Sequence, residues 1–296
     1  MDESTVKESR QLLRRIQDHL FQAHSAFGVE HETVGFVDVI HHPTNPVPDL
    51  NYVTPRRNTA WVSGKYVQEG LDRLKALGRE PRVQYIEGLY PPLFAKMLGD
   101  LDLRVECNTA LMVYVASGAK SAAPKPRTPS GARLEFVTDQ SGVEMWRKVW
   151  RSPAYDVLTL GVEPLAVGRD LAAQRLGQEI DGLMYKRDLP VGVVRVSVQA
   201  STQSGHIVAL ALLREARTPQ MMKVMLAAAL RAALARGCTL VFSPGTTETD
   251  RAISRDLGFV ESGSMVSYAA ESAQVDEVGV QEHDDSVAQP VLALRR

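Results

Sequence analysis

Residues 205–259 decide the fold, and they read GHIVALALLREARTPQMMKVMLAAALRAALARGCTLVFSPGTTETDRAISRDLGF. The apolar run at 206–213 predicts a strand. The alanine-rich segment that begins at Pro219 predicts a long helix, because proline is favoured in a first helical turn. A second apolar run at 239–242 predicts another strand, which a short helix and then Leu257-Gly258-Phe259 follow. This order of elements predicts an α/β fold.

The composition excludes several classes of protein. Of the 296 residues, 44% are hydrophobic and 23% are charged, which is typical of globular proteins, and the length is comfortable for two domains. A formal net charge of -1 and a pI near 6.7 give no general attraction to nucleic acid or to an anionic membrane, so we expect neither as a partner. The polar start, MDESTVKESR, is not a signal peptide, and no apolar run is long enough to span a bilayer. We therefore expect a cytoplasmic protein.

Cysteine and histidine usage indicates no metal site. Cys107 and Cys238 are the two cysteines of the chain, and a cytoplasmic location favours reduced thiols over a disulfide between them. His41 and His42 are adjacent at the end of a predicted strand, where neighbouring side chains point to opposite faces. We expect these histidines at a surface strand end, and no Cys/His spacing predicts a zinc site.

The segment 117–131, SGAKSAAPKPRTPSG, divides the chain. It lacks the apolar side chains needed to pack against a core, so we expect a linker there. The predicted organisation is an N-terminal domain at 1–116, this linker, a C-terminal domain at 132–270 and an acidic, disordered tail at 271–296.

The apolar spacing predicts the other elements. Those expected in the N-terminal half are a helix at 4–24, strands at 34–40 and 51–54, a helix at 62–77, a strand at 82–86, a short helix from Pro91, and apolar strands at 103–107 and 110–115. Those expected between the linker and residue 205 are a strand at 133–138, helices at 143–150 and 165–180, and a hairpin from 183 to 198. Helix, strand, short helix and strand recur at 62–107 and 219–268, which indicates a weak internal repeat.

The C-terminal half resembles the GNAT superfamily of acyl-CoA-dependent N-acyltransferases. The similarity rests on the strand, the loop at Arg217, the long helix, the second strand and Leu257-Gly258-Phe259. It covers residues 131–269, and more weakly 32–115, so the whole chain looks like a tandem GNAT protein with divergent motifs. The resemblance implies two GNAT-like units, each a central mixed sheet flanked by helices. It also implies a bacterial enzyme that uses acetyl-CoA or another acyl-CoA as co-substrate and a small-molecule amine as acceptor, and it leaves a homodimer open.

In this family, a loop of the pattern R/Q-x-x-G-x-G/A points backbone amides at the pyrophosphate from the start of a helix. Unpaired N–H groups and the helix dipole favour a phosphate at that position. The matching run here is RTPQMM at 217–222, in which Arg217 takes the opening position. Gln220 and Met222 stand where the two glycines would let the phosphate approach closely. The resemblance implies that Arg217, Gln220 and Met222 bind the cofactor.

The resemblance also assigns catalytic roles. His206 matches a glutamate that is frequent near the start of the fourth strand in the family, and a histidine can take a proton from an amine near neutral pH. Backbone groups of Leu210 and Leu212 on the same strand would hold the pantetheine arm and polarise the acyl carbonyl. Many family members carry a tyrosine general acid four residues before the glycine of the LGF motif. That position is Ser254 here, and a hydroxyl of this kind is a poor acid at neutral pH.

Each of these residues has a structural interpretation as well. His206 can be a strand-edge histidine that bonds to solvent or backbone, and Arg217 can be a solvated loop arginine. The methionines at 221, 222 and 225 can line an adaptable acyl pocket, although core packing of an apolar helix is favoured. At the level of the whole chain, the alternatives are a non-catalytic GNAT-fold binding or assembly protein that has lost coenzyme A use, and an enzyme that uses the same cleft for another substrate.

Overall fold

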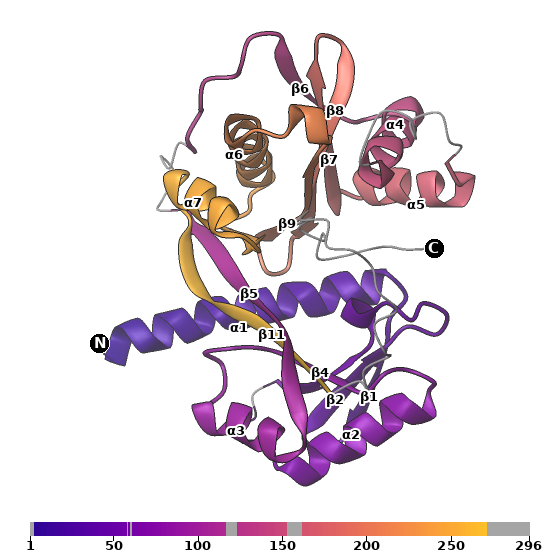
Figure 1. Ribbon diagram of the computed structural model, residues 1–296, viewed down its shortest axis with the longest axis vertical. Coiled ribbons are helices and arrows are strands. Elements are labelled where there is room, and N and C mark those ends of the chain that lie inside the picture. The colour runs from indigo at the N-terminus through magenta and orange to yellow at the C-terminus, as the bar shows by residue number, and fades with distance from the viewer. Residues whose placement is uncertain (1–2, 58, 60, 117–122, 153–161, 271–296) are drawn as a thin grey trace, which may run out of the picture. The chain divides into compact units, whose positions relative to one another are not determined.

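The computed structural model describes residues 3–57, 59, 61–116, 123–152 and 162–270 (Figure 1). The structure is mixed α/β. It divides into two compact units: unit 1 is formed by Met1–Ala110 together with Ser262–Arg296, and unit 2 is formed by Leu111–Glu261. We describe each unit by itself.

Unit 1 has the strand order β1-β2-β3-β4-β11-β5. The β3–β4 pair is parallel, whereas β1–β2, β2–β3 and β4–β11 are antiparallel, so the sheet is mixed. Helices α2 and α3 share an apolar core with the strands. The elements are α1 (Glu3–Ala26), β1 (Glu30–Val34), β2 (Val37–His41), the short helix η1 (Pro48–Leu50), β3 (Tyr52–Pro55), α2 (Gly64–Ala76), β4 (Arg82–Ile86), α3 (Pro92–Asp100), the first part of β5 (Leu103–Val115) and the larger part of β11 (Val260–Ala270).

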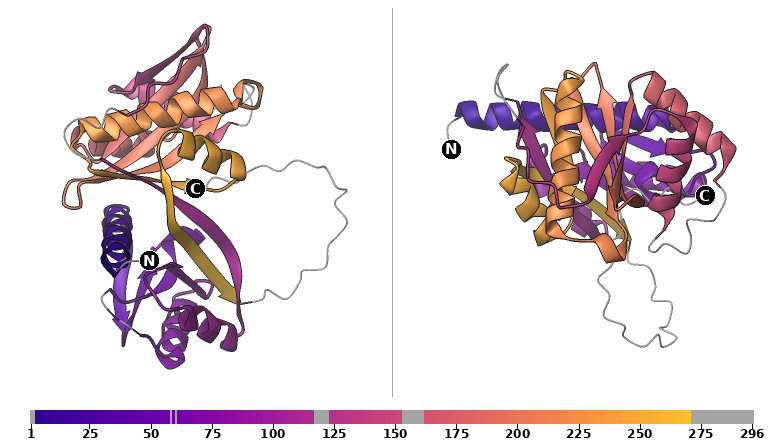
Figure 2. Two further views of the ribbon diagram at one scale, coloured as in Figure 1. Left: turned by 90° about the vertical axis from the view of Figure 1, so that its left-hand side faces the viewer. Right: turned by 90° about the horizontal axis from the view of Figure 1, so that it is seen from above.

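Unit 2 has the strand order β5-β10-β9-β8-β7-β6, in which β9 and β10 are parallel while β8 pairs antiparallel with β7 and β9. Helix α6 covers one face of this sheet, and α4 and α5 cover the other (Figures 1 and 2). The elements that follow β5 are β6 (Ala132–Phe136), α4 (Gln140–Arg151), α5 (Pro164–Arg175), β7 (Glu179–Lys186), β8 (Leu189–Gln199), β9 (Ser204–Leu212), η3 (Arg214–Ala216), α6 (Pro219–Ala235), β10 (Leu240–Gly245) and α7 (Glu248–Asp256).

The two units differ from the domains expected from the sequence, because unit 2 includes the last residues of β5 and unit 1 includes most of β11. Residues 111–115 belong to unit 2, where β5 is next to β10. Residues 262–270 belong to unit 1, where β11 pairs with β4 and Met265 lies opposite Ile86. A boundary placed in the 117–131 segment cannot reproduce this exchange. Residues 117–122 and the 271–296 tail lie outside the described residues.

The order of elements agrees with the sequence prediction, with three differences. The single strand expected at 34–40 is a hairpin of β1 and β2, with Gly35 at positive φ in its turn. The helix expected at 165–180 ends at Arg175, and β7 begins at Glu179, because the buried polar residues at the start of β7 weaken its strand pattern. The two apolar strands expected at 103–107 and 110–115 are one strand, β5. The hairpin is confirmed, with Arg187 and Asp188 at positive φ in its tight turn. The repeat is confirmed in element order: α2-β4-α3-β5 and α6-β10-α7-β11.

Candidate functional site

The parallel strands β9 and β10 of unit 2 pair only where they begin. Their ladder has three residue pairs and ends at His206 opposite Phe242, although β9 continues to Leu212. On its other side, β9 carries a bulge: Arg195 of β8 lies opposite Ala209 and the next residue of β8 lies opposite Ile207, so Val208 is extra. A bulge bends and twists its strand. The described part of β9 after His206 therefore has no strand partner on the side of β10, and its backbone groups on that edge can bind a ligand.

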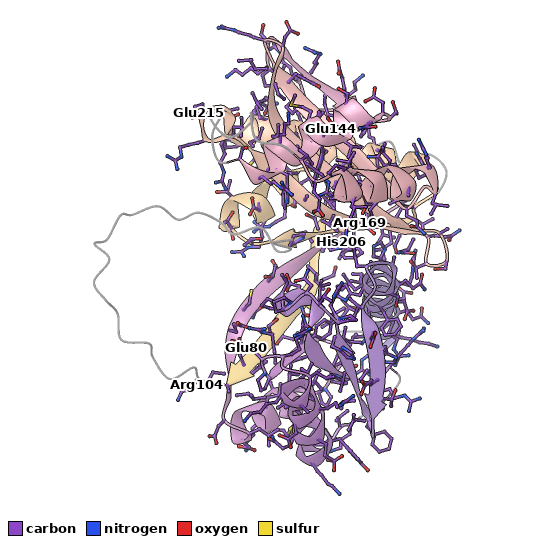
Figure 3. All side chains as sticks on the ribbon, turned by 90° about the vertical axis from the view of Figure 1, so that its right-hand side faces the viewer. Glu80, Arg104, Glu144, Arg169, His206 and Glu215 are labelled. Atoms are coloured by element: carbon purple, nitrogen blue, oxygen red, sulfur yellow. The ribbon has the colours of Figure 1, made fainter. Side chains whose placement is uncertain are left out.

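His206, the predicted base, lies at the point where these strands separate. Its ring is stacked on the ring of Phe242, with centroids 4.3 Å apart and an interplanar angle of 9°. Phe242 is fully buried, whereas His206 is half-buried. Figure 3 labels His206 near the start of β9 and Glu215 on η3 beyond the other end of the strand. The stack fixes the plane of the imidazole ring at the start of the separation.

Leu210 and Leu212 lie on the unpaired stretch of β9, and both side chains are half-buried. Leu212 lies opposite Gly192 of β8, close to Met225 of α6. A Cβ on Gly192 would come within 2.9 Å of the Ala211 carbonyl oxygen and 3.2 Å of Met225 Sδ, so glycine favours the close packing of β8, β9 and α6 at this point. The side chains of Leu210 and Leu212 therefore pack, and it is the backbone of β9 that is available for binding.

The amino end of α6 satisfies most of its own N–H groups. Thr218 is the N-cap: its Oγ1 accepts from Met221 N at 3.2 Å and its carbonyl accepts from Met222 N at 3.1 Å. Pro219 has no N–H to offer. The side chain of Arg217 is exposed and makes no hydrogen bond or ion pair within the described part of the chain. The backbone cradle that the resemblance implies for a pyrophosphate does not fit this helix end as it stands.

A segment that was expected to be an unpacked linker lies along α6. We call residues 123–129, APKPRTP, the strap. Gln220 Nε2 donates to the carbonyl of Arg127 at 2.6 Å, and Arg231 Nη1 donates to the carbonyl of Pro124 at 2.9 Å. Strap residues 124–127 line an open pocket of about 350 Å³ together with Gln220, Lys223, Asp256 and Leu257. The sequence alone does not predict this contact, because a proline-rich segment has the same composition whether it is docked or free.

Comparison with solved structures identifies the architecture. The chain superposes on a GCN5-related N-acetyltransferase from Kribbella flavida with a TM-score of 0.67 at 16% identity, over 90% of this chain and 97% of the other. The chain has the fold of the GCN5-related N-acetyltransferases, the GNAT fold. A GCN5-related N-acetyltransferase from Sphaerobacter thermophilus gives a TM-score of 0.52 at 15% identity, over 78% and 79% of the two chains. A tandem GNAT protein from the clavulanic acid biosynthesis pathway, in a structure without AcCoA, gives 0.53 at 14% identity, over 80% and 79%.

At the level of sequence, no family model matches and no curated protein matches. Three observations on the described residues accompany the GNAT fold. The described residues contain no helix that is long and apolar enough to cross a membrane. They also contain no group of three or more His, Cys, Asp or Glu residues that could hold a metal ion. Cys107 is exposed and Cys238 is buried, and the two cysteines form no disulfide with each other.

Burial favours core packing for the methionines of α6. Met221 and Met225 are buried in the core of unit 2, as core packing of α6 requires, and Met222 is half-buried. Ser254, which occupies the position of the family's tyrosine acid, is only 2% exposed inside α7. Its buried hydroxyl adds to the argument that it does not protonate a leaving group in this GNAT fold.

A buried cluster of charged side chains lies beside the bulge of β9. Arg195 of β8 donates to Asp181 of β7 through Nε at 2.7 Å and to Asp170 of α5 through Nη2 at 2.8 Å. Arg147 of α4 donates to both oxygens of Asp170, at 2.7 and 2.8 Å. The ring of Trp146 lies 4.2 Å from the Arg195 guanidinium carbon. The cluster ties α4, α5, β7 and β8 together on the face of the sheet opposite α6.

Glu179 is the member of this cluster that lacks a full set of partners. It is 8% exposed, and its Oε2 lies 3.5 Å from Arg195 Nη1 but accepts no hydrogen bond within the described part of the chain. Burial raises the pKa of Glu179 to about 7, Arg195 opposes this shift, and the nearby carboxylates of Asp181 and Asp170 add to it. A charge in an apolar strand, as in EIDGLMYK and VGVVRVSV, is the sequence signal that could have revealed this cluster.

We expect Asp181→Ala to lower the free energy of unfolding by about 3 kcal/mol, because it leaves the buried Arg195 without two of its hydrogen bonds. Urea denaturation followed by circular dichroism measures this. The control is Glu135→Ala, which removes an exposed ion pair with Arg133 and should cost less than about 1 kcal/mol. Equal losses in the two variants would contradict a stabilising role for the cluster.

Glu179 also makes stability depend on pH. Because its pKa is raised in the folded protein to about 7 from the ordinary value of 4.5, the folded state holds a proton that the unfolded state has lost between these pH values. The contribution of Glu179 to stability is therefore present below pH 4.5 and is lost as the pH rises to about 7. We expect Glu179→Gln to remove this slope, so that stability relative to wild type increases from pH 5 to pH 8 in denaturation experiments. A difference that is constant with pH would refute the assignment.

Proposed function

We propose that this protein is a cytoplasmic, acyl-CoA-dependent N-acyltransferase that transfers an acyl group, in the simplest case acetyl, to the amine of a small molecule. We further propose that both units are GNAT-like and that unit 2 holds the active site. The observation that carries the proposal is the separation of β9 from β10 after His206, which opens a backbone edge between two parallel strands. Unit 1 supports the tandem arrangement, since its β3 and β4 are also parallel and pair only at Val53 and Val83.

The strand half of this site fits the pantetheine arm of an acyl-CoA. The unpaired backbone groups at 207–212 are donors and acceptors of the kind that the amides of pantetheine require, and one N–H can polarise the acyl carbonyl. The acyl-CoA supplies a thioester as the activated acyl group. The acceptor amine attacks its carbonyl carbon directly in a ternary complex: the C–N bond forms, the C–S bond breaks and sulfur leaves with the electron pair. His206 takes the proton that the amine loses.

The second candidate is a non-catalytic GNAT-fold binding or assembly protein. The self-capped amino end of α6 favours it, because Thr218 and Pro219 leave few N–H groups for a pyrophosphate. The buried Ser254 favours it as well, since no acid of the family's kind serves the leaving thiolate. Direct binding measurements separate the two candidates.

We expect the protein to bind acetyl-CoA or butyryl-CoA in isothermal titration calorimetry, and we expect Arg217→Ala to weaken binding about fivefold, as the loss of one exposed charge contact with a phosphate would. The matched control is Arg214→Ala, another exposed arginine of the same loop, which should bind as wild type does. If folded protein gives no heat with either thioester, the non-catalytic candidate is supported. If both variants bind like wild type, the phosphate does not lie at this loop.

We expect His206→Ala to lower kcat by about 100-fold or more while acetyl-CoA affinity is unchanged, because a positioned base acts only on the chemical step. Release of the free thiol with a panel of small primary amines measures turnover. Ser254→Ala is the control, and it should turn over normally because its hydroxyl is buried. An equal loss in both variants, or none in His206→Ala, would remove His206 from the mechanism.

A further inference from the structure

The strap of unit 2 runs antiparallel to α6. Arg127 is held at the first turn of the helix by Gln220, and Pro124 is held farther along by Arg231. The two donors are 11 residues apart on α6 (231 minus 220), which is about three helical turns. Both contacts use carbonyl oxygens of the strap, so they depend on its path and not on its side chains.

The sequence of the strap favours the extended backbone that this path requires. Proline occupies alternate positions at 124 and 126 and returns at 129, and each proline restricts both itself and the residue before it to extended backbone. The three prolines are half-buried, whereas Lys125, Arg127 and Thr128 are exposed. A segment that is already extended loses little conformational entropy when it docks, so two hydrogen bonds can hold it.

The strap takes up donors that an anionic ligand would need. Gln220 occupies a glycine position of the phosphate loop. A glycine there would let a phosphate reach the backbone N–H groups, whereas Gln220 offers its side-chain N–H groups as donors instead. In the structure, that side chain donates to the carbonyl of Arg127. The strap carbonyl is therefore an acceptor placed at the amino end of α6, where phosphate oxygens are otherwise favoured.

The charges around the strap also favour an anionic ligand at this end of α6. The pocket beneath it is lined by the cations Lys125, Arg127 and Lys223, and the carboxylate of Asp256 neutralises only Lys223, at 2.9 Å. Two exposed cations thus remain on the strap itself. They attract an anionic ligand to the same end of the helix that the strap carbonyls cover.

We propose that the strap is an intrachain competitor for the phosphates of the acyl-CoA. When it is docked, Gln220 and Arg231 bind strap carbonyls and the amino end of α6 is closed to phosphate. When it is released, the side-chain N–H groups of Gln220 become available to a phosphate. Binding of acyl-CoA and docking of the strap exclude each other, so any event that displaces residues 123–129 increases affinity. This inference rests on the proposed use of an acyl-CoA.

The test combines acetyl-CoA titration with limited trypsin digestion. Trypsin can cut after Arg127, which precedes threonine, but not efficiently after Lys125, which precedes proline. Arg231→Ala should release the strap: we expect faster cleavage after Arg127 and about fivefold tighter acetyl-CoA binding, the factor that loss of one such hydrogen bond gives. In wild-type protein, saturating acetyl-CoA should also accelerate cleavage after Arg127. Arg236→Ala, at the exposed end of the same helix, is the control and should change neither quantity.

The opposite results overturn the proposal. If acetyl-CoA protects Arg127 from trypsin and Arg231→Ala binds more weakly, the strap is part of the binding site and does not compete. If Arg231→Ala binds acetyl-CoA as tightly as wild type, the strap is irrelevant but the proposed function stands. If neither protein binds, the proposed function fails together with the competition. Melting temperatures of the variants verify that each is folded, and Gln220→Ala, whose side chain is exposed, is a second release variant that must show the same faster cleavage.

Discussion

The arrangement of unit 2 depends on one constraint: β10 can pair with β9 over only three residues. The ladder ends at His206 and Phe242, and the extra residue Val208 follows two positions later, where a bulge bends and twists its strand. Backbone groups that would be satisfied in a continuous sheet are left on an open edge, which is costly unless water or a ligand binds them. The same point of separation fixes the ring of His206 against Phe242. A binding edge and a titratable side chain thus come from a single irregularity in the sheet.

An open edge on one side of β9 requires a rigid support on the other. The charged cluster supplies it, because Arg195 lies opposite Ala209 at the bulge and is held by two aspartates. Taking such charges out of water is expensive, and it is tolerated only when each is fully paired. Glu179 is incompletely paired, and its raised pKa shows the consequence. The cluster thus joins α4, α5, β7 and β8 on the face of the sheet opposite α6.

The sequence predicted the order of elements because that information is local: apolar spacing, a proline at the start of α6 and a glycine after α7 each act within a few residues. It did not predict that β11 pairs with β4, because the apolar pattern of a strand does not determine which strand it pairs with about 180 residues away in the chain. The position of His206 at the separation followed from resemblance alone. The bulge at Val208, the charges of Asp181 and Arg195 and the docking of the strap depend on tertiary contacts, so no local pattern shows them.

The missing glycines have a different meaning once the strap is included. Taken alone, Gln220 in a phosphate loop indicates that coenzyme A binding has been lost, since its side chain crowds the approach. In the structure, that side chain has a specific acceptor within the same chain, the carbonyl of Arg127. A hydrogen bond of this strength is small compared with the several contacts that a cofactor makes, so it can be exchanged for a phosphate. If this loop binds an acyl-CoA as we propose, cofactor binding is conditional on release of the strap, and the same substitution that weakens the signature provides a means of control.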